Sequence, residues 1–318
     1  MINKPTVFIL GAGASRPYGY PTGIELREQI CSSFVSDSRA YFDHSNGTRS
    51  AFELAQALRQ AEEFVDKFRK SSTKSIDLFL ARNPEFKKMG KWAIVFRILD
   101  AESKSQFREK MENKSQDWYS YLFGKLTEDL VKKDDYSRLS ENNISFITFN
   151  YDRSLEHFLY ESLLNSFNNI STEKIKEQLT TLRVIHIFGQ VAGLDWQDIF
   201  DKIEYRRDIN RINLPGIVKN LRIIYEENEN IELEEARELI SNAQHIFFLG
   251  FGYAKENLKV LNIPKILKKG QNIYGTALHL TKKEIKDIQS IFPDMPPPYA
   301  SYVHIENIDC LMLLRQYL

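Results

Sequence analysis

Polar side chains follow an apolar run at Ile144–Asp152, where the sequence changes abruptly from strand-like residues to an amide and a carboxylate. A buried parallel strand ends in this way when it delivers Asn150 and Asp152 to a cleft at the carboxyl edge of its sheet. The alternative is a plain Asn/Asp turn, because both residue types favour turns and helix caps. Helix-compatible sequence follows at once, in Arg153–Leu159.

A histidine interrupts a second β-type run, Arg183–Gly189. Along a strand His186 and Phe188 project to one side, and Ile185 and Ile187 to the other. An imidazole with an ordinary pKa of about 6.5 suits proton transfer near neutrality. A lone histidine on a strand is more often a hydrogen-bonded structural residue, so both roles stay open.

Glycines follow the short β-type run Thr6–Leu10, in Gly11-Ala12-Gly13-Ala14-Ser15. Glycines at a strand end let the backbone turn tightly and approach a phosphate. The fingerprint of hydride-transferring dehydrogenases requires a third small residue where Arg16 stands, and an acid about 20 residues further on. This sequence lacks both, which disfavours that class of enzyme. A second glycine turn, Gly250–Gly252, ends the apolar run His245–Leu249.

Two further segments are candidates for the site. Tyr18–Gly23 contains a proline and two glycines and predicts a structured loop, with a helix beginning near Ile24. Asp77 is the only acid in Ser75–Leu80. It either caps a helix or lines the site.

Strand and helix patterns alternate in the second half of the sequence. Besides the runs named above, an acidic helix is predicted at Leu233–Asn242, and strands at Leu221–Tyr225, Asn272–Ala277 and Tyr302–Ile305. Alternation of this kind predicts an α/β fold with a mostly parallel sheet and flanking helices. Ligands bind at the carboxyl ends of such strands, so Gly11, Asn150, Gly189 and Gly250 are expected to share one cleft.

The residues from about 24 to 133 show almost no strand pattern. Apolar side chains recur there at helical spacing, which predicts helices packed on the sheet, as a large helical insertion in a single domain covering residues 1–318. Polar composition predicts mobile loops at Ser36–Ser50 and Arg69–Lys74.

Composition excludes several classes of protein. The 43 basic and 43 acidic residues balance, so there is no global field drawing the chain to nucleic acid or membrane. No stretch approaches the ~20 apolar residues of a membrane span. Cys31 and Cys310 are the only cysteines, which cannot form a four-cysteine zinc site and suit a reducing compartment. A cytoplasmic protein is expected.

Four segments, in this order, resemble the SIR2-like family: Gly11–Ser15, Tyr20–Gly23, Thr148–Asp152 and His186–Gly189. The third is similar to the sirtuin Thr-Gln-Asn-Ile-Asp element. Gly250–Gly252 resembles the family's later nucleotide-contacting loop, and Ser75–Leu80 a helical motif of its bacterial branch.

The resemblance implies a Rossmann-like fold that binds NAD and cleaves its nicotinamide–ribose bond, with NAD as substrate and no metal. It further implies an NAD⁺ glycohydrolase that depletes NAD in bacterial anti-phage defence by abortive infection. Asn150, His186 and Asp152 are then the catalytic residues. Asn150 would hold the ribose hydroxyls or the attacking water, Asp152 would orient the amide side or support the developing charge, and His186 would be the general base. The nucleotide-binding residues are then Gly11, Ala12, Gly13, Ser15, Arg16, Thr22, Asp77, Gly189, Gly250 and Gly252.

Two departures from the family pattern matter. Sirtuin deacylases carry a four-cysteine zinc module that two cysteines cannot supply, so a protein deacylase is not expected. The family's catalytic histidine stands directly before a glycine, where this sequence has Phe188. The second departure keeps open a sensor that binds NAD or an ADP-ribose-type nucleotide without turnover. A third possibility is an interaction subunit of a helicase or nuclease. For the hydrolase we expect control by a partner protein or by homo-oligomerisation, because unregulated NAD loss would poison the cell.

The cysteine count gives a first prediction. The purified protein should contain no stoichiometric zinc, and any activity on NAD should survive a strong zinc chelator. Elemental analysis that found one zinc per chain would contradict this expectation.

Overall fold

The computed structural model describes residues 1–44, 51–107, 114–132, 135–167, 170–199, 201–212, 214–223, 231–292 and 303–318. It contains one parallel six-stranded sheet in the order β3-β2-β1-β4-β5-β6. The strands are β1 (Thr6–Leu10), β2 (Ile144–Thr148), β3 (Val184–His186), β4 (His245–Leu249), β5 (Asn272–Thr276) and β6 (Val303–Glu306). The predicted α/β, Rossmann-like fold is thereby confirmed.

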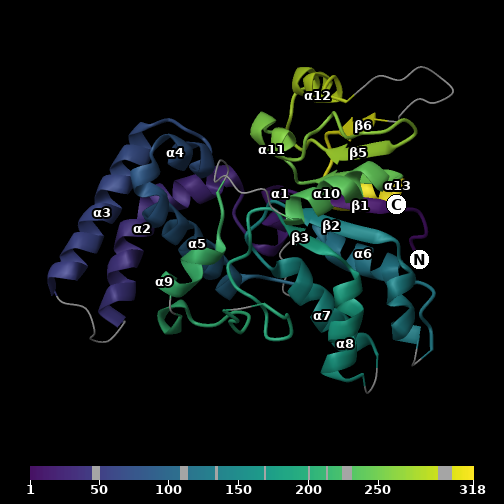
Figure 1. Ribbon diagram of the computed structural model, residues 1–318, viewed down its shortest axis with the longest axis horizontal. Coiled ribbons are helices and arrows are strands. Elements are labelled where there is room, and N and C mark those ends of the chain that lie inside the picture. The colour runs from purple at the N-terminus through teal and green to yellow at the C-terminus, as the bar shows by residue number, and fades with distance from the viewer. Residues whose placement is uncertain are drawn as a thin grey trace.

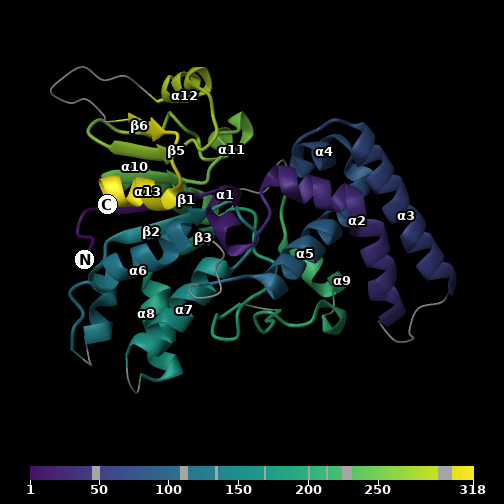
Figure 2. The same ribbon diagram turned by 180° about the vertical axis from the view of Figure 1, so that it is seen from behind.

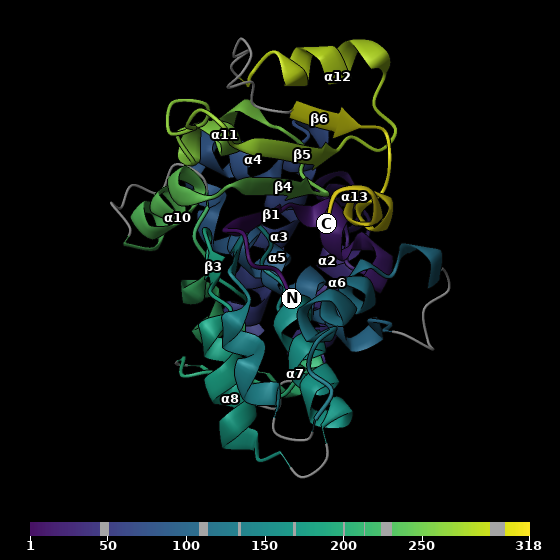
Figure 3. The ribbon, with the colours of Figure 1, turned by 90° about the vertical axis from the view of Figure 1, so that its right-hand side faces the viewer.

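Helices cover both faces of the sheet (Figures 1 and 2). Figure 3 shows α6 (Trp118–Thr127) and α13 (Cys310–Tyr317) on one face, and α10 (Ile231–Asn242) and α11 (Lys255–Val260) on the other. The remaining helices beside the sheet are α1 (Ala12–Ser15), α7 (Ser154–Ser166), α8 (Thr172–Thr181) and α12 (Lys282–Gln289). The central strands β1 and β2 are buried at every position, as expected when helices cover both faces.

An aromatic ladder crosses the sheet at one level of the register. Phe146, Phe8, Phe247, Tyr274 and His304 are successive cross-strand partners from β2 to β6. The Phe8 ring lies 5.2 Å from Phe146 and 5.3 Å from Phe247, centroid to centroid. Because side chains alternate between faces along a strand, a one-residue slip would move a rung to the opposite face. The ladder therefore fixes the register.

Four helices between β1 and β2 form a group of their own, called here the helical lobe: α2 (Gly23–His44), α3 (Ala51–Lys70), α4 (Ile76–Arg82) and α5 (Lys87–Lys104). The lobe lies beyond the end of the sheet opposite the two termini (Figure 1). β1 runs toward it and ends in α1, so the lobe faces the carboxyl edge of the strands. A short helix, α9 (Leu214–Ile217), packs against α5.

Two local predictions were wrong. Residues 36–44 are the end of α2 rather than a loop, while residues 45–50 lie outside the described part. Ser36 and Ser38 donate to carbonyls one turn earlier, and the Phe42 ring packs 4.9 Å from Trp92, so polar composition was a poor guide. The predicted strand at Leu221–Tyr225 is also absent from its described part, residues 221–223. There Arg222 makes one ladder-like bond, from its amide to the Phe188 carbonyl at 2.8 Å.

Other predicted boundaries shift by a few residues. The run Arg183–Gly189 forms a strand only at Val184–His186, and the strand predicted at Tyr302–Ile305 is seen as Val303–Glu306, with Tyr302 outside the described residues. Between residues 24 and 133 the described part contains no strand, as the helical pattern indicated. Within the described ranges, no helix is long and apolar enough to cross a membrane.

Candidate active site

The carboxyl ends of the central strands lie at one level. Leu10 of β1 pairs with Thr148 of β2 and with Leu249 of β4, and Thr148 pairs with His186 of β3. The turns that follow therefore begin at the same edge, as the sequence predicted. The strand order 3-2-1-4-5-6 reverses direction between β1 and β4, and dinucleotides bind at such a reversal point in doubly wound sheets.

Two glycine turns interlock at this reversal point. The Gly11 amide donates to the Leu249 carbonyl and the Gly13 amide to the Gly250 carbonyl, each at 3.0 Å. A Cβ on Gly13 would lie 2.9 Å from Gly250 Cα, and a Cβ on Gly250 would lie 1.9 Å from the Ala14 nitrogen. These glycines are thus required for backbone contact between the turns. Since the Gly11 and Gly13 amides already have partners, they are not free to donate to a phosphate in this conformation.

Two further residues predicted to hold phosphate, Ala12 and Arg16, are less buried than Ser15. Ala12 is half-buried and Arg16 is exposed. Arg16 Nε donates to Glu25 Oε1 at 3.0 Å, and the Thr22 amide donates to Glu25 Oε2 at 2.8 Å. Glu25, which the sequence analysis had not assigned to the site, therefore ties Arg16 to the Tyr20–Gly23 loop.

Asn150 holds the first glycine turn against the end of β2. Its Nδ2 donates to the Gly11 carbonyl at 3.0 Å and to Ser15 Oγ at 3.1 Å. The side chains of Asn150 and Ser15 are both buried. The sequence-predicted residues Gly11, Ser15 and Asn150 are thus brought together.

Asp152 is buried two residues further on, at the start of α7. Its Oδ1 accepts from the Ser154 amide at 3.1 Å and from the Ser154 hydroxyl. Ser154 Oγ lies 2.7 Å from Tyr119 Oη, which gives a chain of hydroxyls leading to the carboxylate. Burial raises the pKa of Asp152, against hydrogen bonds from Ser154 and Ser15 that act to lower it.

The His186 side chain is 9% exposed and lies against the Asn150 backbone. Its Nδ1 is 3.0 Å from the Asn150 carbonyl oxygen, and its Nε2 is 2.7 Å from Glu156 Oε1. Burial alone would lower the pKa of His186, but the Glu156 carboxylate outweighs it and holds the pKa above its ordinary value. A ring between two acceptors carries two protons and has no lone pair left to accept another. Both ring nitrogens of His186 are thus engaged, one of them by the Asn150 backbone.

Phe188 stands in an apolar cluster at the same edge. Its ring centroid lies 5.5 Å from that of Phe149, and Phe149 lies 5.3 Å from Phe251. These three buried aromatic side chains follow β3, β2 and β4. Gly189, next to Phe188, has φ +77°, and a Cβ there would lie 2.1 Å from the Asn220 carbonyl oxygen, so its glycine serves the turn.

Asp77 connects the helical lobe to the edge of the sheet. Tyr151 Oη donates to Asp77 Oδ1 at 3.1 Å, and the cap of α4 is Ser75, whose Oγ accepts from the Leu78 amide at 3.3 Å. The capping alternative for Asp77 is therefore not what is seen. Asp77 is thus linked to the Asn150–Asp152 turn through Tyr151.

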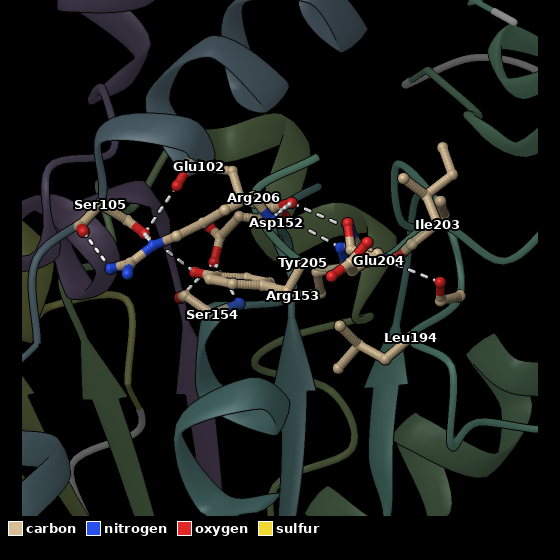
Figure 4. Close-up of polar contacts among 12 residues, drawn as sticks. Glu102, Ser105, Asp152, Arg153, Ser154, Leu194, Ile203, Glu204, Tyr205 and Arg206 are labelled. Carbon is tan, nitrogen blue, oxygen red and sulfur yellow. Dashed lines mark hydrogen bonds and ion pairs between the residues drawn. The ribbon is translucent and has the colours of Figure 1, made fainter. Parts of the chain in front are cut away.

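Arg153 and Glu102 form a buried ion pair that the sequence analysis missed. Arg153 Nε and Nη2 donate to the two carboxylate oxygens of Glu102 at 2.9 and 2.8 Å, and neither side chain is more than 1% exposed. Figure 4 shows this pair beside Asp152 and Ser154. The only sequence signal was the position of Arg153 next to Asp152, and nothing in the sequence indicates Glu102 as its partner.

No family model matches the chain, and no curated protein matches it either. One of the similar solved structures is that of Sir2Tm bound to a propionylated peptide, with 17% sequence identity, a TM-score of 0.40, and coverage of 98% of this chain and 90% of that one. The similarity is remote, and no residue assignment depends on it. In the described part of the chain, no group of three or more His, Cys, Asp or Glu side chains is placed to hold a metal ion.

The interlocked turns predict a strong effect of one methyl group. Gly250→Ala should destabilise the fold by about 2–4 kcal/mol, because Gly250 has φ +57° and no room for a Cβ. Gly252→Ala is the matched control: nothing lies within 4 Å of a Cβ there, and its cost should stay within about 1 kcal/mol. Urea titration followed by circular dichroism measures both, and equal midpoints would contradict the packing.

The His186–Glu156 pair predicts a pH-dependent stability. Because the folded pKa of His186 is raised, its protonated ring stabilises the fold fully below about pH 6.5, and this contribution is lost as the pH rises through the folded pKa. His186→Gln should lower the free energy of unfolding by about 3–5 kcal/mol near pH 6, as for other broken buried pairs, and by less at pH 9.

His157 provides the opposite case. Burial, followed by the charges of Arg206 and Arg153, lowers the pKa of His157 to about 4. Protonation below about pH 6.5 therefore favours the unfolded chain, and the difference in the free energy of unfolding between wild type and His157→Gln should grow as the pH rises.

Urea titrations at pH 6 and pH 9 test both variants. If the difference in the free energy of unfolding between wild type and His186→Gln did not change with pH, a charged His186–Glu156 pair would be ruled out.

Proposed function

We propose that this protein is an NAD⁺ glycohydrolase that cleaves the nicotinamide–ribose bond to give nicotinamide and ADP-ribose. The observation that carries the proposal is the Asn150 side chain, held between the Gly11 carbonyl and the Ser15 hydroxyl at the reversal point of a 3-2-1-4-5-6 sheet. A dinucleotide bound there lies across the carboxyl ends of β1 and β4. Asp152 stands two residues away.

Hydrolysis of the nicotinamide–ribose bond requires a group that stabilises positive charge and a group that positions a water molecule. As the C–N bond breaks, nicotinamide leaves as a neutral base and positive charge develops on the ribose, as in other glycoside cleavages. In our proposal Asn150 orients the ribose hydroxyls or the attacking water. The Asp152 carboxylate stabilises the developing charge and accepts the proton that the water loses. Its raised pKa suits the second task.

The remaining residues have supporting roles. Ala12, Ser15, Arg16 and Thr22 would contact the pyrophosphate side, where Arg16 is exposed. The turns at Gly11, Gly13, Gly189, Gly250 and Gly252 would shape the nucleotide site. We propose His186 as the residue that fixes Asn150, in place of the general-base role implied by the family resemblance. Asp77 would act through Tyr151.

The second candidate function is a sensor that binds NAD or an ADP-ribose-type nucleotide without turnover. The observation that favours it is the state of His186, since both ring nitrogens are already bonded to acceptors. A site with no free imidazole and with Phe188 beside Gly189 has fewer groups for proton transfer. Binding with no release of nicotinamide is its signature.

The biological role proposed is NAD depletion in the bacterial cytoplasm as an abortive-infection response to phage. Such an enzyme must stay inactive until infection, so a regulatory partner protein or homo-oligomerisation is part of the proposal. The helical lobe is the element proposed to carry these regulatory contacts, because it faces the carboxyl edge of the sheet.

The site assignment predicts the effect of one substitution. Asn150→Ala should lower nicotinamide release at least about 100-fold, because it removes the amide proposed to orient the ribose hydroxyls or the attacking water in the transition state. Free nicotinamide from purified protein and NAD, measured by chromatography, gives the rate. Asn165→Ala is the control, since Asn165 lies exposed on α7, where its Nδ2 donates to the Glu161 carbonyl at 2.7 Å.

Calorimetric titration with NAD separates the two functions. Binding and turnover by wild type support the hydrolase, and binding alone, even after addition of the activating partner, supports the sensor. Near-normal turnover by Asn150→Ala would remove Asn150 from the site, and absence of NAD binding by folded wild type would overturn both functions.

A further inference from the structure

Every donor of the Arg153 guanidinium has an acceptor. Besides the two bonds to Glu102, Nη1 donates to the carbonyls of Gly193 at 2.8 Å and Ile203 at 2.6 Å, and Nη2 donates to that of Glu204 at 3.2 Å. A guanidinium has five N–H groups, so none is left over. Figure 4 shows these contacts converging on Arg153 from opposite sides.

The acceptors come from separate parts of the fold. Glu102 lies near the end of α5, in the helical lobe, while the three carbonyls belong to the segment 193–204 that follows β3. Glu102 Oε1 also accepts from the Arg206 amide at 3.0 Å, and Arg206 Nε donates to Ser105 Oγ at 3.2 Å. One buried side chain thus joins the lobe, the 193–206 segment and the start of α7.

The position of Arg153 in the chain connects the Arg153–Glu102 ion pair to the candidate site. It follows Asp152 directly and precedes Ser154, the residue that donates to Asp152. The Tyr151 carbonyl accepts from the Val191 amide at 2.9 Å, so the same turn is also held by the segment after β3. A displacement of α5 therefore has two possible effects. It moves Arg153, and Asp152 with it, or it separates Glu102 from Arg153 and leaves a buried guanidinium without an anion, which is strongly unfavourable.

We infer that Arg153 and Glu102 are positioning residues that couple the helical lobe to the Asn150–Asp152 turn, so that movement of the lobe changes catalysis through this ion pair. The inference rests on the proposed function for its consequence in turnover, while the mechanical coupling itself does not need it. The lobe, as the part that a regulator would contact, then acts on the orientation of Asp152 rather than on nucleotide affinity.

Two charge-conserving variants test the coupling. Arg153→Lys keeps the cation but has fewer donors than the site has acceptors, and Glu102→Asp keeps the anion on a shorter side chain. Each should lower kcat for nicotinamide release about 10- to 100-fold through misplacement of Asp152, while the Kd for NAD stays within about twofold. Amides of residues 149–156 should exchange hydrogen faster in both variants.

Arg97→Lys is the matched control. Arg97 is also a buried arginine, but it lies on α5 and pairs with Asp37 of α2, so both partners belong to the lobe. It should lower the Tm to a similar extent while leaving kcat and the exchange of residues 149–156 as in wild type. An equal loss of kcat in Arg97→Lys would mean general loosening and would overturn the inference, as would unchanged kcat in folded Arg153→Lys and Glu102→Asp.

Hydrogen exchange of the wild-type protein in low urea tests the coupling between the lobe and the Asn150–Asp152 turn, and it depends neither on activity nor on the folding of variants. If the coupling holds, amides near Glu102 and amides of residues 149–156 open together, with one urea dependence. Independent opening of the two segments would overturn it. Absence of NAD turnover in wild type would instead refute the hydrolase and leave the exchange result to stand by itself.

Discussion

The backbone contact between the turns after β1 and β4 is the constraint on which the candidate site depends. Gly13 and Gly250 approach so closely that neither position has room for a Cβ. This contact sets the distance between the two halves of the sheet at its carboxyl edge. Asn150 then reaches across from β2 to bind the first turn, and Asp152 follows in a position fixed by α7. With a side chain at either glycine, the two turns would have to separate, and the Gly11 carbonyl that binds Asn150 belongs to one of them.

Several charged side chains lie close to that edge of the sheet. Asp152, Arg153, Glu156 and Glu102 are buried, and the side chain of His186, which pairs with Glu156, is 9% exposed. Buried ion pairs contribute little net stability, since desolvation offsets their attraction, but they are costly to break. The two ion pairs therefore hold the elements that they connect in a fixed geometry. The His186–Glu156 pair connects Asn150 to β3 and α7, and the Arg153–Glu102 pair connects the residue after Asp152 to the lobe and to the segment after β3.

The sequence predicted the central strands well, but it did not predict the two ion pairs. Thr6–Leu10, Ile144–Thr148 and His245–Leu249 are short apolar runs closed by glycine or amide residues, and such local patterns predicted both the parallel sheet and its level edge. Glu102 and Arg153, by contrast, look like solvated charges on two unrelated helices, and their pairing exists only after the lobe has packed. His186 was predicted as a general base without any sign of its partner Glu156, and its bonds to Glu156 and to the Asn150 carbonyl are the reason why we propose an anchoring role instead. The serines of α2 were mistaken for a loop because their internal hydrogen bonds cannot be read from composition.

The place of β1 in the sheet has a consequence for how the protein is made. Residues 6–10 form a strand that is buried on both faces and on both edges, yet its two partners are residues 144–148 and 245–249. At ribosomal rates of about 5–20 residues per second, this apolar segment leaves the ribosome on the order of ten seconds before its first partner exists. Unpaired strands of that kind associate with other chains when they stay exposed. Production of this protein should therefore depend on chaperones that bind the nascent chain early, and a lower translation speed would lengthen the exposure of β1 rather than relieve it.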